Sequence, residues 1–156
     1  MKTVVIYSTH TGRGNTEKIA KEIASELDCH MVRITKDFDP KSLDLNDFEM
    51  VIIGTGIRGG EPYEAIVTFL ENADFQNSKR QFAIFLTWCG GGASDKLTLD
   101  KLINVLQSKN QKVHDNCYKC FGEYLLFRRG HPNLKDTNSA RKWARKLTLT
   151  ADSEET

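Results

Sequence analysis

The hydrophobic residues of this chain gather in short runs that are typical of strands buried inside a sheet. Residues 4–7, 50–53 and 82–87 are almost continuously apolar, as expected of parallel strands covered on both faces. Residues 29–34 alternate between apolar and polar positions and predict a shorter strand, and a further strand is expected within 113–120. The pattern therefore predicts five strands.

Between these runs, apolar residues recur at the three- and four-residue spacing of amphipathic helices. The first such stripe contains Ile19, Ala20, Ile23, Ala24 and Leu27. Comparable stripes lie within 65–73, 99–106 and 140–147. Five strands alternating with four helices predict parallel β/α units joined by right-handed crossovers. We expect one domain over residues 1–147, followed by a polar, disordered tail over 148–156 that has nothing to pack.

Charge and composition narrow the classes of partner. With 22 Lys and Arg against 21 Asp and Glu, the chain of 156 residues carries a formal net charge of +1, so neither nucleic acid nor a membrane is an expected partner. The basic cluster of Arg141, Lys142, Arg145 and Lys146 is expected to be solvated helix surface, the alternative being a patch that steers an acidic redox partner. The chain shows no signal-peptide pattern and no apolar run near the roughly 18–20 residues of a membrane span. We therefore expect a cytoplasmic protein with reduced thiols.

Turns that contain glycine follow three of the expected strands, at residues 8–16, 54–61 and 87–92. Because parallel strands place such turns at one edge of the sheet, the three are expected to meet where folds of this class bind ligands. The first turn is rich in hydroxyl groups and glycine, contains Arg13, and leads into a helix whose first N–H groups attract anions. It therefore predicts a monophosphate site.

The alternative for the first turn is structural, because Asn15 is a good N-cap residue and such junctions are common in α/β domains. The turn lacks the Gly-Lys-Ser/Thr ending of a P-loop and the GxGxxG spacing of a dinucleotide site. This argues against triphosphates and dinucleotides. The convergence of three turns is the stronger evidence for a ligand.

The combination of turns resembles the flavodoxin family over residues 3–147. The matching segments are residues 8–12 with 15–17, 54–60, 87–92, and 120–122 with 129–133. The resemblance implies an α/β fold, a three-layer αβα sandwich with a five-stranded parallel sheet of order 2-1-3-4-5. It also implies that the chain binds FMN without a covalent bond.

Carried over position by position, the resemblance implies three groups of FMN-binding residues. The first group would surround the phosphate: Ser8, Thr9, His10, Thr11, Gly12, Asn15 and Thr16. The second would lie along one side of the isoalloxazine ring: Thr55, Gly56, Ile57, Arg58 and Gly59. The third would lie along the other side: Thr87, Trp88, Cys89 and Gly90.

Three features of this chain depart from the family pattern. Arg13 and Gly14 look like an insertion in the phosphate turn. Ile57 and Arg58 stand where an aromatic residue is usual, which leaves Trp88 as the expected stacking ring. The chain is also nearly neutral, whereas many electron-carrying flavodoxins are strongly acidic. Arg58 beside the flavin is expected to favour the reduced anion and to raise its potential relative to an acidic rim.

The resemblance implies a monomeric electron carrier that passes electrons between redox partner proteins, a reductase and an acceptor, with no catalytic residue of its own. The alternative is an enzyme on the same fold, an FMN-dependent NAD(P)H or quinone reductase or an oxidase of a porphyrin-type substrate. An enzyme needs added surface for its second substrate, and residues 121–132 are the one insertion that offers some. Bleaching of the flavin by NAD(P)H alone would favour the enzyme.

Two other classes share the topology. A phospho-acceptor receiver domain needs acidic residues after the first and third strands, where this chain has Ser-Thr at 8–9 and Gly-Thr at 54–55. A structural protein without flavin is the other alternative. Cys117 and Cys120 have the spacing of a metal or disulfide pair, but no second pair exists, and residues three apart on a strand point to opposite faces. No metal site is expected.

Overall fold

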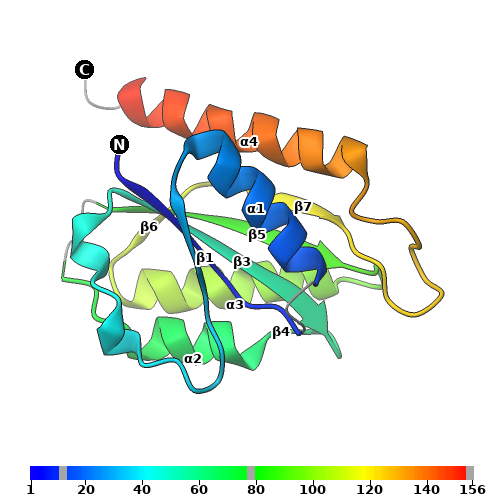
Figure 1. Cartoon of the computed structure of the whole chain (residues 1–156). Coiled ribbons are helices and arrows are strands. Elements are labelled where there is room, and N and C mark those ends of the chain that lie inside the picture. Colours follow the sequence, from blue (N-terminus) through cyan, green and yellow to red (C-terminus); the bar gives the residue numbers. More distant parts are fainter. Residues whose placement is uncertain (11–13, 77–79, 154–156) are drawn as a thin grey trace.

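The apolar runs of the chain form the central strands of a parallel sheet. The computed structural model describes residues 1–10, 14–76 and 80–153. In it β1 (Thr3–Tyr7), β3 (Met50–Arg58) and β5 (Gln81–Trp88) lie side by side and are buried along most of their length. The alternating run forms β2 (His30–Arg33), which pairs with the outer side of β1. Figure 1 shows these strands crossing the middle of the molecule.

Two short strands share the place of the expected fifth strand. β6 (Lys112–Val113) and β7 (Tyr118–Phe121) both pair with β5 in parallel, at opposite ends of it. The chain leaves the ladder between them, where the Asn116 carbonyl accepts a hydrogen bond from Trp143 Nε1 at 2.9 Å. The order β2-β1-β3-β5-β6 confirms the predicted fold class, with the fifth position divided in two.

A small antiparallel extension lies at the end of β3. The chain turns at Gly59 and Gly60, whose φ angles of 59° and 79° fall in the left-handed region, and returns as β4 (Glu61–Pro62). This turn carries the chain from the central strand to the start of α2 (Glu64–Asn72).

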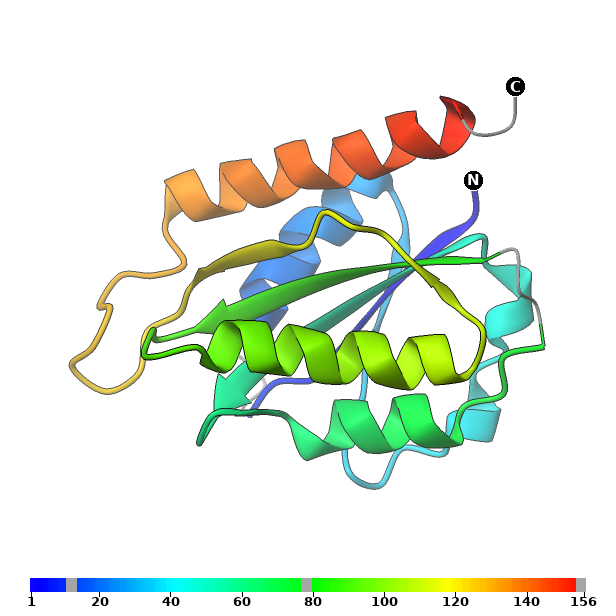
Figure 2. The same cartoon turned by 180° about the vertical axis from the view of Figure 1, so that it is seen from behind.

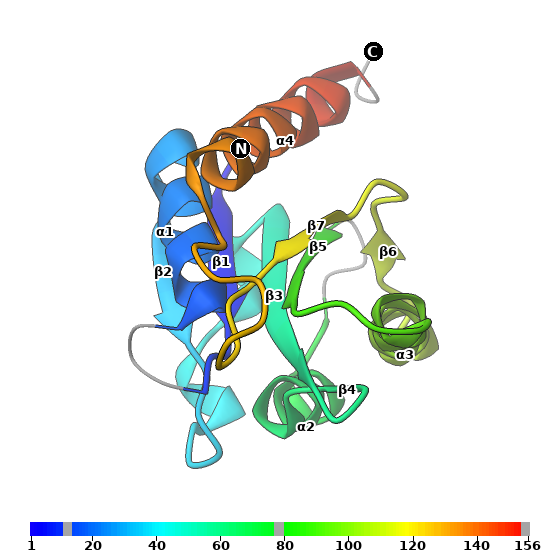
Figure 3. The ribbon, with the colours of Figure 1, turned by 90° about the vertical axis from the view of Figure 1, so that its right-hand side faces the viewer.

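The helices cover the two faces of the sheet in pairs, as Figures 2 and 3 show. One layer contains α1 (Asn15–Leu27) and α4 (Leu134–Ser153), and the other contains α2 and α3 (Ser94–Ser108). Two single-turn 3-10 helices, η1 (Pro40–Ser42) and η2 (Leu45–Asp47), lie in the connection between β2 and β3.

The core is divided in two because successive residues of a strand point to opposite faces. Val4 and Ile6 of β1 pack in the cluster that includes the buried residues of α2 and α3. Val5 and Tyr7 pack in the cluster that includes α1 and α4. The sheet thus separates two hydrophobic cores, one on each of its faces.

The last helix is longer than the apolar stripe predicted. The expectation of a polar tail from residue 148 differs from the structure, in which α4 continues to Ser153, and residues 154–156 lie outside the described part. Leu147 is buried, while Leu149, two residues later, is 68% exposed. Residues 147–151 contain neither glycine nor proline, so no residue there interrupts the backbone hydrogen bonding of a helix.

Two arginines of the basic cluster on α4 form ion pairs within the protein. Arg141 and Arg145 form ion pairs with Glu22 and Glu26 of α1. These contacts bridge the two helices of one layer rather than leaving both arginines to solvent. Among the helices of the described part, none combines the length and the apolar character that a membrane crossing requires.

Candidate cofactor site

A cavity of about 590 Å³ lies at the carboxyl edge of the sheet, where the turns after β1, β3 and β5 meet. The predicted residues that line it are Thr9, His10, Asn15, Ile57, Arg58, Gly59, Thr87, Trp88 and Cys89. The turns come together as their placement after parallel strands predicts. Thr11 and Gly12 lie outside the described residues.

The other predicted residues of the described part are not among those that line the cavity: Ser8, Thr16, Thr55, Gly56 and Gly90. Several of them fix the turns by hydrogen bonds. The hydroxyl oxygens of Thr16 and Thr87 are 2.8 Å apart in a buried contact that joins α1 to β5. The Thr55 hydroxyl accepts a hydrogen bond from the Tyr63 N–H at 3.0 Å. Thr16 and Thr55 therefore hold the turns together without lining the cavity themselves.

The N-terminus of α1 opens into this cavity. Gly14 is the N-cap residue, and no side chain of the described part caps the helix, so its first N–H groups keep their capacity to donate. Asn15 does not serve as the cap, because its side chain points to the other wall and donates to the Glu123 carbonyl at 2.9 Å. Lys18, one turn further along, also lines the cavity and adds a positive charge.

The wall formed by the second turn contains a cation and an aromatic ring. Arg58 Nη1 lies 3.1 Å from each ring nitrogen of His10, which ties the first and second turns together. Tyr63 lines the cavity as well and lies against Gly56, where an added Cβ would be only 2.6 Å from the tyrosine ring. Burial raises the pKa of Tyr63, while Arg58 and the backbone of His10 act to lower it.

Sequence reasoning missed Tyr63. An aromatic residue was expected within the second turn, where the sequence has Ile57 and Arg58. The ring instead comes from the residue immediately before α2, after the chain has reversed through β4. A Pro-Tyr pair at the entrance of a helix was the available signal.

The wall formed by the third turn is built on stacked rings. Trp88 lines the cavity and stacks on Phe121 of β7, with ring centroids 6.2 Å apart and an interplanar angle of 22°. The Gly122 N–H donates to the Trp88 carbonyl at 2.8 Å and continues the pairing of the two strands. The indole is thus held from the side of β7.

A fourth segment, residues 122–125, completes the cavity and was not predicted as part of it. It belongs to the insertion at 121–132, which projects as the yellow-orange loop at the right of Figure 1. Tyr124 and Phe127 exchange two backbone hydrogen bonds at 3.0 and 2.9 Å, which makes the insertion a tight hairpin. Its contact with α1 is close, because a Cβ on Gly122 would lie 2.5 Å from the Asn15 amide nitrogen.

The cysteine pair lies apart from the cavity. Cys117 precedes β7, Cys120 is buried within it, and all four cysteines are free thiols. Burial raises the pKa of Cys120 to about 12 and also raises that of Cys117. Cys89 alone among the four lines the cavity.

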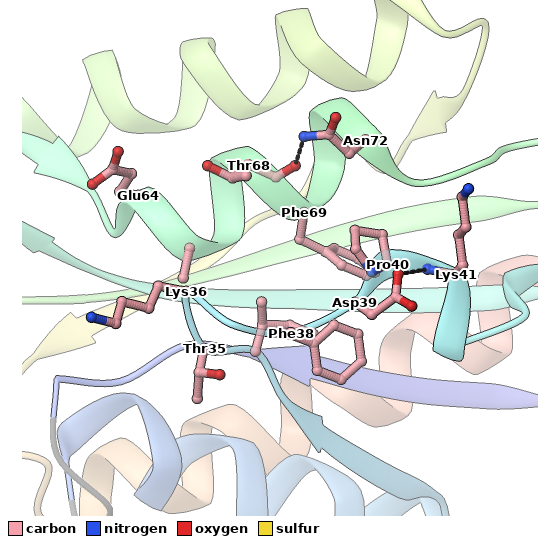
Figure 4. A pocket seen from close by; sticks show the side chains of 12 residues that line it. Thr35, Lys36, Phe38, Asp39, Pro40, Lys41, Glu64, Thr68, Phe69 and Asn72 are labelled. Atoms are coloured by element: carbon pink, nitrogen blue, oxygen red, sulfur yellow. Dashed lines mark hydrogen bonds between the residues drawn. The ribbon is translucent and has the colours of Figure 1, made fainter.

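A second cavity, of about 620 Å³, lies between the segment 34–41 and α2, and Figure 4 shows its walls. Asn72 donates to the Thr68 carbonyl at 2.7 Å, and Asp39 accepts from the Lys41 N–H at 3.0 Å. The lining combines the cations of Lys36 and Lys41 with the carboxylates of Asp39 and Glu64. None of the three glycine-containing turns contributes a described residue to this cavity.

Comparison with known proteins agrees with this architecture. The chain is 27% identical over 154 residues to an uncharacterized protein of Methanocaldococcus jannaschii, in an alignment that covers 94% of this chain and 98% of the relative. Its fold is similar to that of a flavodoxin from Streptococcus pneumoniae (18% identity, TM-score 0.73, 96% of this chain and 99% of the other). It is equally similar to a WrbA-like flavodoxin from Agrobacterium tumefaciens (17%, TM-score 0.74, 97% and 98%). The family model described as the flavodoxin domain matches residues 4–118. The chain therefore belongs to the flavodoxin family.

Proposed function

We propose that this protein binds FMN in the cavity at the carboxyl edge of the sheet and carries electrons between a reductase and an acceptor protein. One observation carries the proposal: the N-terminus of α1, which no described side chain caps, and the aromatic rings of Tyr63 and Trp88 open into the same cavity. Membership of the flavodoxin family supports it.

The residues fit both halves of FMN. The phosphate is an anion, and it would find the first N–H groups of α1, the hydroxyl of Thr9 and the charge of Lys18. The ring system is flat and largely apolar, and it would lie between the wall of Ile57 and Tyr63 and the wall of Trp88. Glu123 is the one carboxylate among the lining residues, and it accepts the Gly130 N–H at 2.8 Å, so that part of its charge is already balanced.

Bound FMN would supply electron transfer in steps of one or two electrons. The protein has three tasks in such a reaction. Its glycine turns would offer backbone N–H and C=O groups to the ring, its aromatic walls would exclude water, and Arg58 would add positive charge to the lining. None of these tasks requires a general acid or base.

The proposal is tested by mixing the purified apoprotein with FMN and, separately, with riboflavin. We expect FMN to bind at least roughly tenfold more tightly, because only FMN carries the group that the N-terminus of α1 would hold. Visible absorbance and the quenching of flavin fluorescence measure both dissociation constants. An apoprotein that binds neither compound at micromolar concentrations would contradict the proposal.

A second candidate is an FMN-dependent reductase or oxidase with a small-molecule substrate. One observation favours it: the hairpin adds Tyr124 and Leu125 to the mouth of the cavity, and these side chains are 55% and 72% exposed. An apolar substrate could contact them. Anaerobic addition of NADPH or NADH to the holoprotein separates the two candidates, because a carrier stays oxidised until its reductase is added and a reductase bleaches at once.

A further inference from the structure

The side chain of Arg128 lies against one peptide of the third turn. Its Nε donates to the Cys89 carbonyl at 3.2 Å, and its guanidinium carbon is 3.9 Å from the centre of the Phe121 ring. A Cβ placed on Gly90 would lie 3.2 Å from Nη2, so the guanidinium follows the Cys89–Gly90 peptide closely. The residue reaches this peptide from the hairpin, a segment that is adjacent only in space.

The backbone of Arg128 adopts a conformation that is unfavourable for a residue with a side chain. Its φ angle is 55°, in the left-handed region, which costs a residue with a Cβ about 1–2 kcal/mol. The side chain is exposed, so burial of apolar surface does not offset this cost. What the conformation achieves is the stacking on Phe121 and the hydrogen bond to Cys89.

A cation on a carbonyl oxygen changes the other end of the same peptide group. The Cys89 carbonyl and the Gly90 N–H belong to one conjugated unit, so a charged donor on the oxygen withdraws electrons from the nitrogen and makes the N–H a stronger donor. Trp88 and Cys89 line the cavity, and Gly90 follows them on the same turn with a φ angle of 88°. The peptide therefore begins at a residue of the cavity wall.

We propose that Arg128 is a positioning residue that strengthens the Gly90 N–H as a donor and thereby makes the cavity prefer reduced FMN over oxidised FMN. Reduction adds negative charge to the flavin ring, and a stronger donor favours the more negative form. The inference rests on the proposed function, since it requires FMN to lie against the third turn.

The neighbouring residue provides a matched control. Arg129 carries the same charge one position further along, is exposed, and makes no ion pair or side-chain hydrogen bond with the described residues. Arg128→Gln and Arg129→Gln therefore remove the same charge from nearly the same place. Only the first removes the contact with Cys89. Arg128→Lys keeps a charge and a donor within reach of that carbonyl.

The experiment measures the binding of oxidised FMN and the reduction potentials of the bound flavin in the four proteins. In Arg128→Gln we expect the preference for reduced FMN to fall roughly tenfold, which lowers the potential of a one-electron step by about 59 mV. Arg129→Gln should change the preference for reduced FMN less than twofold. Arg128→Lys should recover most of the preference that Arg128→Gln loses. In the apoproteins, hydrogen exchange of the Gly90 amide should be slower in Arg128→Gln alone, because a less acidic N–H loses its proton to hydroxide more slowly.

Two results would overturn the inference alone, and a third would overturn it together with the proposed function. Equal shifts in Arg128→Gln and Arg129→Gln would show a general effect of surface charge. Unchanged potentials in Arg128→Gln would show that the peptide contact has no influence. In both cases wild-type protein that binds FMN leaves the proposed function intact, whereas wild-type protein that binds no FMN removes the function and this inference together.

Discussion

Gly56 shows how little space separates the second turn from the ring beside it. The phenol carbon and oxygen of Tyr63 would each be 2.6 Å from a Cβ at this position, a distance at which one of the two groups must move. Gly59, three residues later, has open space around its missing Cβ and a φ angle of 59°. The two glycines are therefore kept for different reasons, one for close approach and one for backbone conformation.

Gly56→Ala should destabilise the protein by about 1–3 kcal/mol, because the new methyl group collides with Tyr63. Urea unfolding measures the change. Gly59→Asn is the control and should cost less than about 1 kcal/mol, since asparagine tolerates the left-handed region. In a Tyr63→Ala background the added cost of Gly56→Ala should largely disappear. If it persists there, the collision is not with Tyr63.

Cys120 gives a pH dependence with a definite sign. Its pKa is raised to about 12 by burial, from the ordinary value of 9.0 that it regains on unfolding. Between about pH 9 and 10 the unfolded chain releases a proton that the folded chain keeps, so the free energy of unfolding should fall as pH rises. For this thiol the slope approaches about 1.4 kcal/mol per pH unit. Urea unfolding from pH 7 to 10 measures it.

Cys120→Ala should lower stability at every pH and flatten the decline above pH 9. The burial of Cys29, whose pKa is raised to about 11, leaves a smaller decline in the variant. Below pH 8 the two curves should run parallel, which serves as the internal control. If the free energy of unfolding falls with the same slope in both proteins above pH 9, Cys120 has the same protonation state in the folded and the unfolded chain, and the prediction is wrong.

At the scale of the element, α4 has a buried apolar stripe and, just after it, an exposed leucine. Ala140, Trp143, Ala144 and Leu147 are buried against α1 and the sheet, and Leu149 extends into solvent. The helical stripe read from the sequence located the packed part correctly and placed the end of order at residue 147. Periodicity detects where a helix touches the core, whereas the end of a helix depends on local propensity and capping.

The same substitution, leucine to alanine, compares a buried and an exposed position of α4. Leu147→Ala should cost about 2–5 kcal/mol of stability, because Leu147 is 1% exposed and its loss leaves a cavity in the core. Leu149→Ala should change stability by no more than about 0.5 kcal/mol. Both are measured by thermal unfolding, and leucine and alanine are both good helix formers. Comparable losses in the two variants would place residue 149 in the packed part.

At the scale of the whole molecule, the apolar runs and stripes were sufficient to predict alternating strands and helices and the meeting of three turns, whereas the order of strands came from the resemblance to the flavodoxin family. They could not predict contributions that depend on contacts between distant segments. The hairpin reaches the cavity through the hydrogen bond from Asn15 to Glu123, across 108 positions of sequence, and Tyr63 reaches it only after the reversal at Gly59 and Gly60. Such contacts leave no period in the sequence.

If the cavity holds FMN, the whole fold should become more stable in its presence. At a hundredfold excess over the dissociation constant, ligand binding adds about 2.7 kcal/mol. For a chain of this length that should raise the unfolding midpoint by about 5–10 °C. Circular dichroism during heating measures it, and riboflavin at the same concentration should raise the midpoint less. A midpoint that does not respond to FMN would count against the site.

The division of the fifth strand also affects how copies of this protein meet one another. One border of the sheet is β2, four residues long with His30 and Arg33 exposed, and the other consists of β6 and β7, two and four residues long and separated by 114–117. Neither border offers a long row of unsatisfied amides in register, which is the template that fibril growth uses. Pairing between the sheet edges of two copies could therefore engage only two to four residues at a time along the described strands.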